Sequence, residues 1–180
     1  MRLTENTRFN KYLKYKLIAE FDDKVLYDLP IKLKFRRWHK VYRLPSSVWD
    51  IKFSDFIKAV NAIDSITDFL EQITNVNIFI WTNSKIKLSL PLYSFYKDET
   101  IKILEMFKEV TEEAPKGQGT VKDMAEFGLT SLVDTVACSD VTKHDYVYNM
   151  TVADVFVEYK RKIDTIINTE AQQKYYAKNN

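Results

Sequence analysis

After Pro30, the stretch Ile31-Lys32-Leu33-Lys34-Phe35-Arg36 alternates strictly between apolar and basic side chains. Because successive residues of a β-strand point to opposite faces, this alternation predicts a half-buried strand with one apolar and one cationic face. Upstream, residues 15–21 and 25–27 also have strand character, and the turn signal Asp22-Asp23-Lys24 separates them. Residues 1–12 are polar without a clear period, so we expect a basic arm there.

A second β region is predicted further along the chain. Residues 76–81 form a short apolar run, Thr82-Asn83-Ser84 is a turn signal, and residues 85–90 alternate again between polar and apolar. This pattern is typical of a β-hairpin over residues 76–92. Between the two β regions, apolar residues at helical spacing predict two short helices over residues 54–63 and 65–74, the second opened by a capping box at Ser65.

The C-terminal part has the period of helices. Apolar spacing predicts a helix over residues 97–111, further helices over 121–137 and up to 148, and a long final helix over 152–176 that begins at the capping box of Thr151. Residues 113–120 contain Pro115, Gly117 and Gly119 and form the predicted linker. We therefore predict an α+β fold, with a β-rich domain over residues 1–112 that includes short helices and a hairpin, followed by a helical region over 121–180.

Composition excludes several classes of protein. The 180-residue chain is 46% hydrophobic, contains one cysteine and three glycines, and has no apolar run long enough to cross a membrane. No glycine-rich phosphate loop, metal-ligand spacing or catalytic motif is present in the sequence. Cys138 lies at the end of a helical apolar face and is predicted to be a buried thiol. We expect a protein that is not an enzyme and that needs no metal or other cofactor.

Positive charge is concentrated near the N-terminus. Residues 1–45 carry a net charge of +7 and the remainder −5. The basic strand region supplies six candidate partner-binding cations: Lys32, Lys34, Arg36, Arg37, Lys40 and Arg43. They fit an acidic surface on a neighbouring copy or another protein, a nucleic acid, or a merely solvated face. Aromatic residues alternate with them, as in single-strand binders, but Phe35 belongs to the apolar face, which favours a protein partner over nucleic acid.

The predicted final helix has an apolar stripe that runs past its expected cover. Beyond Ile163 no later segment of the sequence is left to pack against it, so we expect a partner site there. Its candidate residues are Ile166, Ile167, Tyr175 and Tyr176. The alternative is that the helix folds back on the N-terminal β region.

Two stretches resemble a recurring pattern in tail and baseplate assembly proteins of tailed bacteriophages. Residues 44–57, LPSSVWDIKFSDFI, are similar to the pattern in which a Trp precedes a short strand and a helix start, and the helices over 56–63 and 66–73 continue the likeness. Residues 132–163 contain VTKHDYVYNM at 141–150, which resembles the turn and short helix before a final long helix in such proteins.

The resemblance implies a non-enzymatic structural or assembly component of a tailed-phage particle, located in the virion or in the host cytoplasm during assembly. Its partners would be copies of itself or other phage structural proteins, without a membrane. The alternative is a small nucleic-acid-binding protein that uses the basic strand over residues 31–43.

Overall fold

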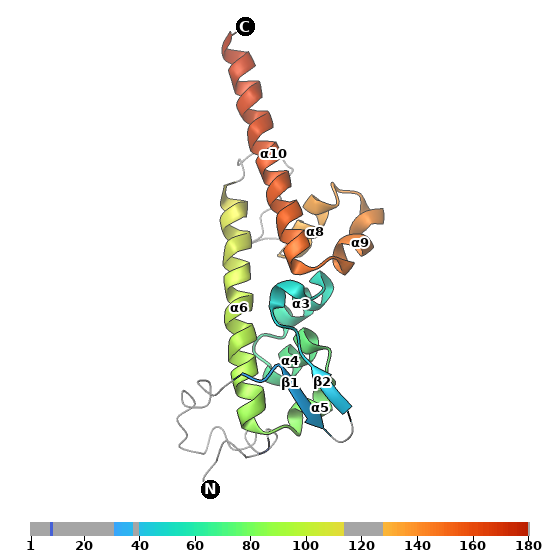
Figure 1. Cartoon of the computed structure of the whole chain (residues 1–180). Helices are drawn as coiled ribbons and strands as arrows, with labels where there is room; N and C mark the ends of the chain where they lie inside the picture. The colour runs from blue at the N-terminus through green and yellow to red at the C-terminus, as the bar shows by residue number, and fades with distance from the viewer. Residues whose placement is uncertain (1–7, 9–30, 38–39, 114–127, 180) are drawn as a thin grey trace. The chain divides into compact units, whose positions relative to one another are not determined.

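The computed structural model describes residues 8, 31–37, 40–113 and 128–179 (Figure 1). Across these residues the elements follow in the order β1 (Lys34–Arg37), β2 (Lys40–Arg43), the 3-10 turn η1 (Val48–Asp50), α3 (Phe53–Asn61), α4 (Ile66–Thr74), α5 (Ile78–Thr82), α6 (Ile86–Glu112), α8 (Thr130–Val136), η2 (Val141–Lys143), α9 (His144–Asn149) and α10 (Val152–Asn179). Two compact units result. Unit 1 contains the described residues up to Ile51 and Asp55–Thr100, and unit 2 contains Lys52–Ser54 and the described residues from Ile101 onward.

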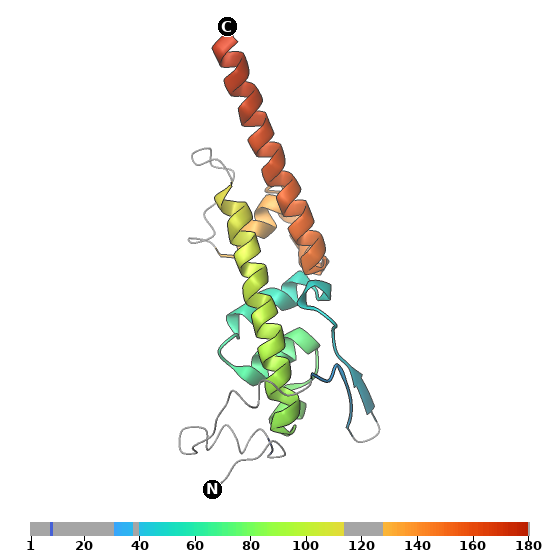
Figure 2. The same cartoon turned by 60° about the vertical axis from the view of Figure 1, so that its left-hand side comes forward.

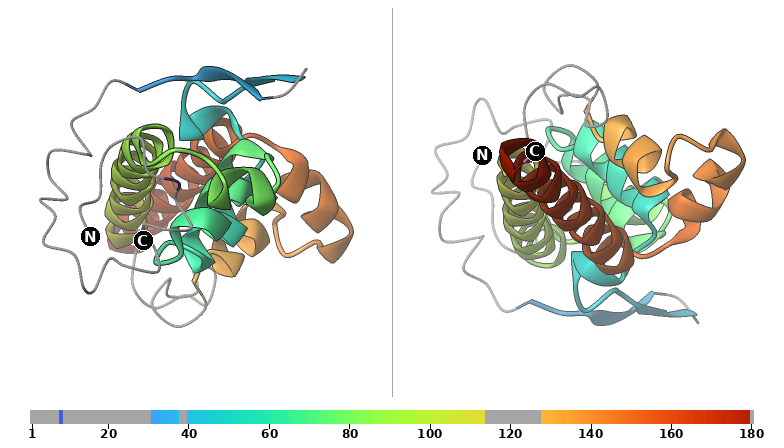
Figure 3. Two further views of the ribbon diagram at one scale, coloured as in Figure 1. Left: turned by 90° about the horizontal axis from the view of Figure 1, so that it is seen from below. Right: turned by 90° about the horizontal axis from the view of Figure 1, so that it is seen from above.

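The prediction of a β-rich N-terminal half is wrong. In the described part of the chain, the only sheet is the antiparallel pair β1–β2, and helices make up most of the remainder. The alternating stretch does form a strand at Lys34–Arg37, but it turns back on β2 instead of continuing. Helices α4, α5 and the first part of α6 lie on one side of this hairpin (Figure 3). The predicted strands over 15–21 and 25–27 lie outside the described residues.

The predicted hairpin over residues 76–92 is helical, because its polar residues cap a helix instead of making a turn. Asn77 accepts a hydrogen bond from the Phe79 amide at 2.9 Å, and Glu71 accepts one from the Ile78 amide at 2.8 Å. These two acceptors satisfy amides that the first turn of α5 leaves without a helical partner. A short apolar run of this kind fits a strand and a helix equally well, and the caps decide for the helix.

Helix α6 replaces the second predicted strand and extends without a break to Glu112 (Figure 2). Eight of its buried side chains recur at alternating steps of three and four residues and form a stripe along the helix, and Leu90, Pro91 and Leu92 widen the buried surface near its start. The stripe is Ile86, Ser89, Tyr93, Tyr96, Thr100, Ile103, Phe107 and Val110. The alternation of Ile86, Leu88 and Leu90 covers too few residues to distinguish a strand from this longer repeat.

In unit 1, the first half of α6 holds the segment that leads out of the hairpin. The Tyr96 hydroxyl donates to the Pro45 carbonyl at 2.7 Å. The Glu99 carboxylate accepts from the Val48 amide at 2.9 Å and from the Ser47 hydroxyl, so it caps the start of η1. Tyr93 donates to the Ile63 carbonyl at 2.7 Å and thereby fixes the end of α3.

In unit 2, the second half of α6 packs on aromatic residues. The Phe107 ring lies 6.1 Å from that of Phe53, 5.2 Å from that of Phe156 and 6.0 Å from that of Tyr159. The Tyr159 and Thr111 hydroxyls are hydrogen-bonded at 2.8 Å. Helix α10 begins as predicted, with the Thr151 hydroxyl accepting from the Asp154 amide at 3.1 Å. The predicted long final helix is therefore present and runs to Asn179.

The boundary between the two units falls within α6, between Thr100 and Ile101. The division of the chain at residues 113–120 stays a prediction. The predicted linker lies outside the described residues apart from Glu113, as does the predicted start of the helix over 121–137. The described part of that helix is α8.

The Glu99 cap generates a prediction about stability. Glu99→Ala removes the acceptor for the Val48 amide and the Ser47 hydroxyl, so we expect a loss of about 1–2 kcal/mol in the free energy of unfolding, measured by urea titration. Glu105→Ala is the matched control, because Glu105 is exposed on the same helix, and it should change stability by less than about 0.5 kcal/mol. Equal losses in both variants would contradict the role of Glu99.

Two buried tyrosines predict a loss of stability in alkali. Burial raises the pKa of Tyr96 above its ordinary value of 10.0, and the negative charge of Glu99 raises it further. Burial also raises the pKa of Tyr159, although its hydrogen bond with Thr111 works in the opposite direction. Because both tyrosines ionise more easily in the unfolded chain, their contribution is fully present below pH 10 and is lost as the pH rises towards the folded-state pKa.

We therefore expect the free energy of unfolding to fall above about pH 10, by up to about 1.4 kcal/mol per pH unit for each buried tyrosine. Tyr96→Phe should make the fall shallower, whereas Tyr175→Phe, which changes an exposed tyrosine, should not. The measurement is urea unfolding across the alkaline range, followed alongside tyrosinate absorbance of the native protein. A slope that the two variants change equally would contradict the assignment.

Candidate functional site

A cavity of about 460 Å³ lies in unit 1, beside β1 and the start of α6. The described residues that line it are Arg8, Lys32, Phe35, Arg37, Asn83, Ser84, Lys85, Lys87 and Leu88. Five of these nine are basic and none is acidic. Since the whole chain has a net charge of only +2, a general excess of basic residues does not explain this concentration.

Three separate segments bring the basic residues together. Arg8 pairs with Lys85 in an isolated antiparallel bridge, which places its backbone beside the start of α6. Alternation along β1 puts Phe35 and Arg37 on the same face. The Arg37 guanidinium donates to the Ile80 carbonyl in α5 at 3.0 Å, and this hydrogen bond ties the end of β1 to the helical layer.

Phe35 forms the aromatic wall of the cavity. Its ring is stacked on that of Tyr42 in β2, with centroids 5.1 Å apart and planes 14° apart. The Trp81 ring lies 5.6 Å from it at a tilt of 55°. These two contacts hold the Phe35 ring in a fixed orientation next to the cationic side chains, so the cavity offers an aromatic surface as well as positive charge.

The hairpin separates the six predicted basic residues into groups. Lys32 and Arg37 line the cavity, whereas Lys34, Lys40 and Arg43 are exposed outside it. Arg36 belongs to β1, but its side chain lies outside the described structure. Phe35 lines the cavity together with Lys32 and Arg37, whereas Lys34 points to the opposite face of β1.

The register of the hairpin places like charges opposite each other. Lys34 is paired with Arg43, and Arg37 with Lys40. Like charges directly opposite across an antiparallel pair are destabilising. Contacts outside these pairs work against this repulsion, because Arg37 donates to the Ile80 carbonyl and the Lys40 ammonium lies 5.2 Å from the centroid of the Tyr42 ring.

The sequence pattern did not predict three of the cavity's basic residues as candidate binding residues. Arg8 falls in the predicted arm, and Lys85 and Lys87 fall in the supposed second hairpin. No local pattern links them to residues 31–43, because their approach depends on the tertiary packing of α5 and α6 against β1. Their basic character was the only available signal.

The predicted partner residues of α10 do not form one face. Ile166 and Ile167 are half-buried, and Tyr175 and Tyr176 are 66% and 65% exposed, with rings 5.8 Å apart. At 3.6 residues per turn, Ile167 and Tyr175 fall on one side of the helix, and Ile166 and Tyr176 fall on the opposite side. The last fully buried side chain of α10 is Ile163.

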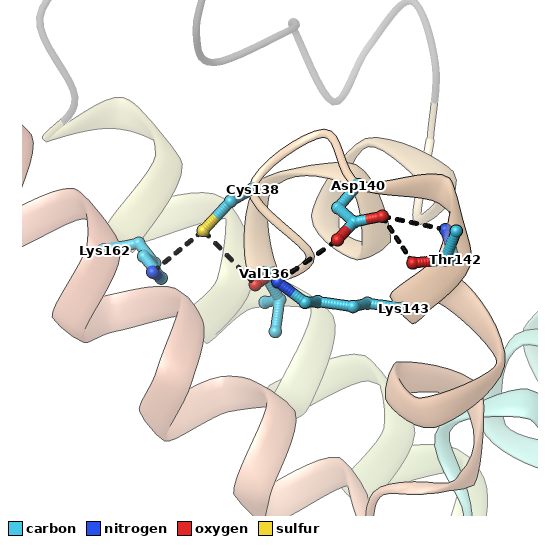
Figure 4. A network of polar contacts seen from close by, with 6 residues as sticks. All are labelled: Val136, Cys138, Asp140, Thr142, Lys143 and Lys162. Carbon is cyan, nitrogen blue, oxygen red and sulfur yellow. Dashed lines mark hydrogen bonds and ion pairs between the residues drawn. The ribbon is translucent and has the colours of Figure 1, made fainter.

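Cys138 is exposed, so the prediction of a buried thiol is wrong (Figure 4). Helix α8 ends in two left-handed residues, Cys138 at φ 57° and Ser139 at φ 60°, which turn the thiol outward to lie 3.0 Å from the Lys162 ammonium. Nearby, hydrogen bonds from Thr142 and Lys143 lower the pKa of Asp140, which caps η2. The contacts of Asp140 with Thr142 and Lys143 are those of a residue that caps a helix.

No group of three or more metal-ligating side chains occurs among the described residues. None of their helices combines the length and apolar character that crossing a bilayer requires. His144, at the start of α9, has its Nε2 atom 2.9 Å from the Asp134 carboxylate.

Comparisons with known proteins found no match. No protein-family model, no curated protein and no solved structure matches the chain. The phage resemblance therefore remains an interpretation of the sequence pattern, and the cavity and α10 have to be interpreted from their own chemistry.

Proposed function

We propose that the protein is a non-enzymatic structural or assembly component of a tailed-phage particle that acts through protein–protein contacts. One of these contacts is with a second copy of itself. The observation that carries the proposal is the end of α10. This helix continues for 16 residues after Ile163, about 24 Å at 1.5 Å per residue. An isolated helical segment of this length is only marginally stable in water, so a partner that covers one of its faces would stabilise it.

One face of this segment is self-complementary. Its residues follow one another at steps of three, four, four and three: Asp164, Ile167, Ala171, Tyr175 and Lys178. The order is symmetric about Ala171, with an acid at one end, a base at the other, and apolar residues between. Two copies packed antiparallel about Ala171 would bring Ile167 of each against Tyr175 of the other, and Asp164 against Lys178.

This pairing is chemically sound at each position. Ala171 is small and lets the two helices approach closely at the centre. Ile167 and Tyr175 supply the apolar and aromatic contacts that interface cores favour. The charged pairs at the two ends fix the antiparallel direction, because a parallel pair would put like charges opposite each other.

The test is the oligomeric state, measured by sedimentation over a range of protein concentrations. We expect Ile167→Ser combined with Tyr175→Ser to weaken self-association at least tenfold while the melting temperature of the dilute protein changes little. The matched control is Ile166→Ser combined with Tyr176→Ser, which makes the same chemical change on the opposite side and should leave association intact. A large drop in the melting temperature of the dilute protein would show that Ile167 belongs to the chain's own core.

Charge reversal tests the direction of pairing. Asp164→Lys alone places two like charges at each end of the antiparallel pair and should weaken association. Adding Lys178→Asp reverses both partners and should restore it. If the double variant associates no better than the single one, the two positions do not face each other. Failure of the chain to co-purify with particles of the phage that encodes it would separately contradict the phage assignment.

A further inference from the structure

We propose that the basic cavity of unit 1 binds single-stranded nucleic acid, with the backbone phosphates on its lysine and arginine side chains and one base on Phe35. The first support is electrostatic. Five basic residues surround about 460 Å³ without an acidic side chain among the described lining residues. Several cations around one cavity raise its positive electrostatic potential, so the site favours a ligand with several negative groups.

The second support is the like-charge register of the hairpin. Lys40 lies directly opposite the cavity residue Arg37, on the same face of the hairpin, and extends the positive surface of the cavity along β2, whereas Lys34 and Arg43 point to the other face. The cations form a track longer than one small anion would need. A chain of phosphates, each carrying one negative charge, matches a track better than a single phosphate group does.

The third support is the aromatic wall, which distinguishes nucleic acid from an acidic protein. Single-strand binders combine a basic groove with aromatic side chains on which bases stack. Phe35 meets this requirement because Tyr42 fixes its ring and the ring lines the cavity together with Lys32 and Arg37. In a duplex the bases are already stacked on each other and paired, so only a single strand can place a base there.

The probe is a fluorescein-labelled 15-nucleotide oligo-dT, and binding to the full chain is measured by fluorescence anisotropy at several salt concentrations. The cavity variant is Lys32→Gln with Lys85→Gln, both exposed lysines of the lining. The matched control is Lys102→Gln with Lys160→Gln, which removes the same charge from exposed sites elsewhere. We expect the cavity variant to lower affinity at least tenfold and to reduce the salt slope by about 1.4, as for two lost phosphate contacts.

The control variant should stay within twofold of the unaltered protein, and Phe35→Leu should weaken binding about fivefold or more without changing the salt slope. A 15-base-pair duplex should bind at least tenfold more weakly than the single strand.

Four results would overturn the proposal. They are equal losses in the cavity and control variants, equal affinity for the duplex, equal affinity for poly-glutamate, and full competition by polyphosphate with no effect of Phe35→Leu. The third would identify an acidic protein partner, and the fourth an anion site that takes no base. If Phe35→Leu fails to fold, the two lysine variants still distinguish binding in the cavity from non-specific electrostatic binding to the protein surface.

Discussion

The burial of one stripe along α6 is the constraint on which both units of the chain depend. Eight side chains from Ile86 to Val110 face inward at steps of three and four, although the helix contains Pro91. In unit 1 the helix contributes Tyr93, Tyr96 and Glu99. Their side chains form hydrogen bonds with the backbone of Ile63, Pro45 and Val48, respectively. In unit 2 it contributes Phe107, the centre of an aromatic cluster. A residue change on this stripe therefore acts on backbone and core at once.

The sequence predicted those elements whose signals are local. Ser65 and Thr151 stand at the starts of α4 and α10, as their capping patterns indicate, although only Thr151 accepts a side-chain cap hydrogen bond. The error over residues 76–92 arose because the deciding contacts are not local to the apolar run. Glu71 caps α5 from the preceding helix, seven residues away, and the face of α6 becomes clear only over its whole length.

For the same reason, the sequence predicted only some of the residues of the candidate site. Lys32 and Arg37 could be named because a strand with a cationic face is visible in sequence, whereas Arg8, Lys85 and Lys87 reach the cavity through packing that no single segment specifies. Strict alternation assigned Phe35 to one face of the strand but did not say which other side chains that face contacts. In a two-stranded hairpin beside a helix, one face can be apolar at Tyr42 and cationic at Arg37 within a few residues.

The left-handed end of α8 has a practical consequence for spectroscopy. It turns outward the single cysteine of the chain, so a thiol-reactive probe would modify each copy at one defined position. Because Cys138 lies beside Lys162 of α10, a spin label or fluorophore attached there reports on the rotation of that helix without any engineered residue. The native sequence thus carries its own reporter for motion in unit 2.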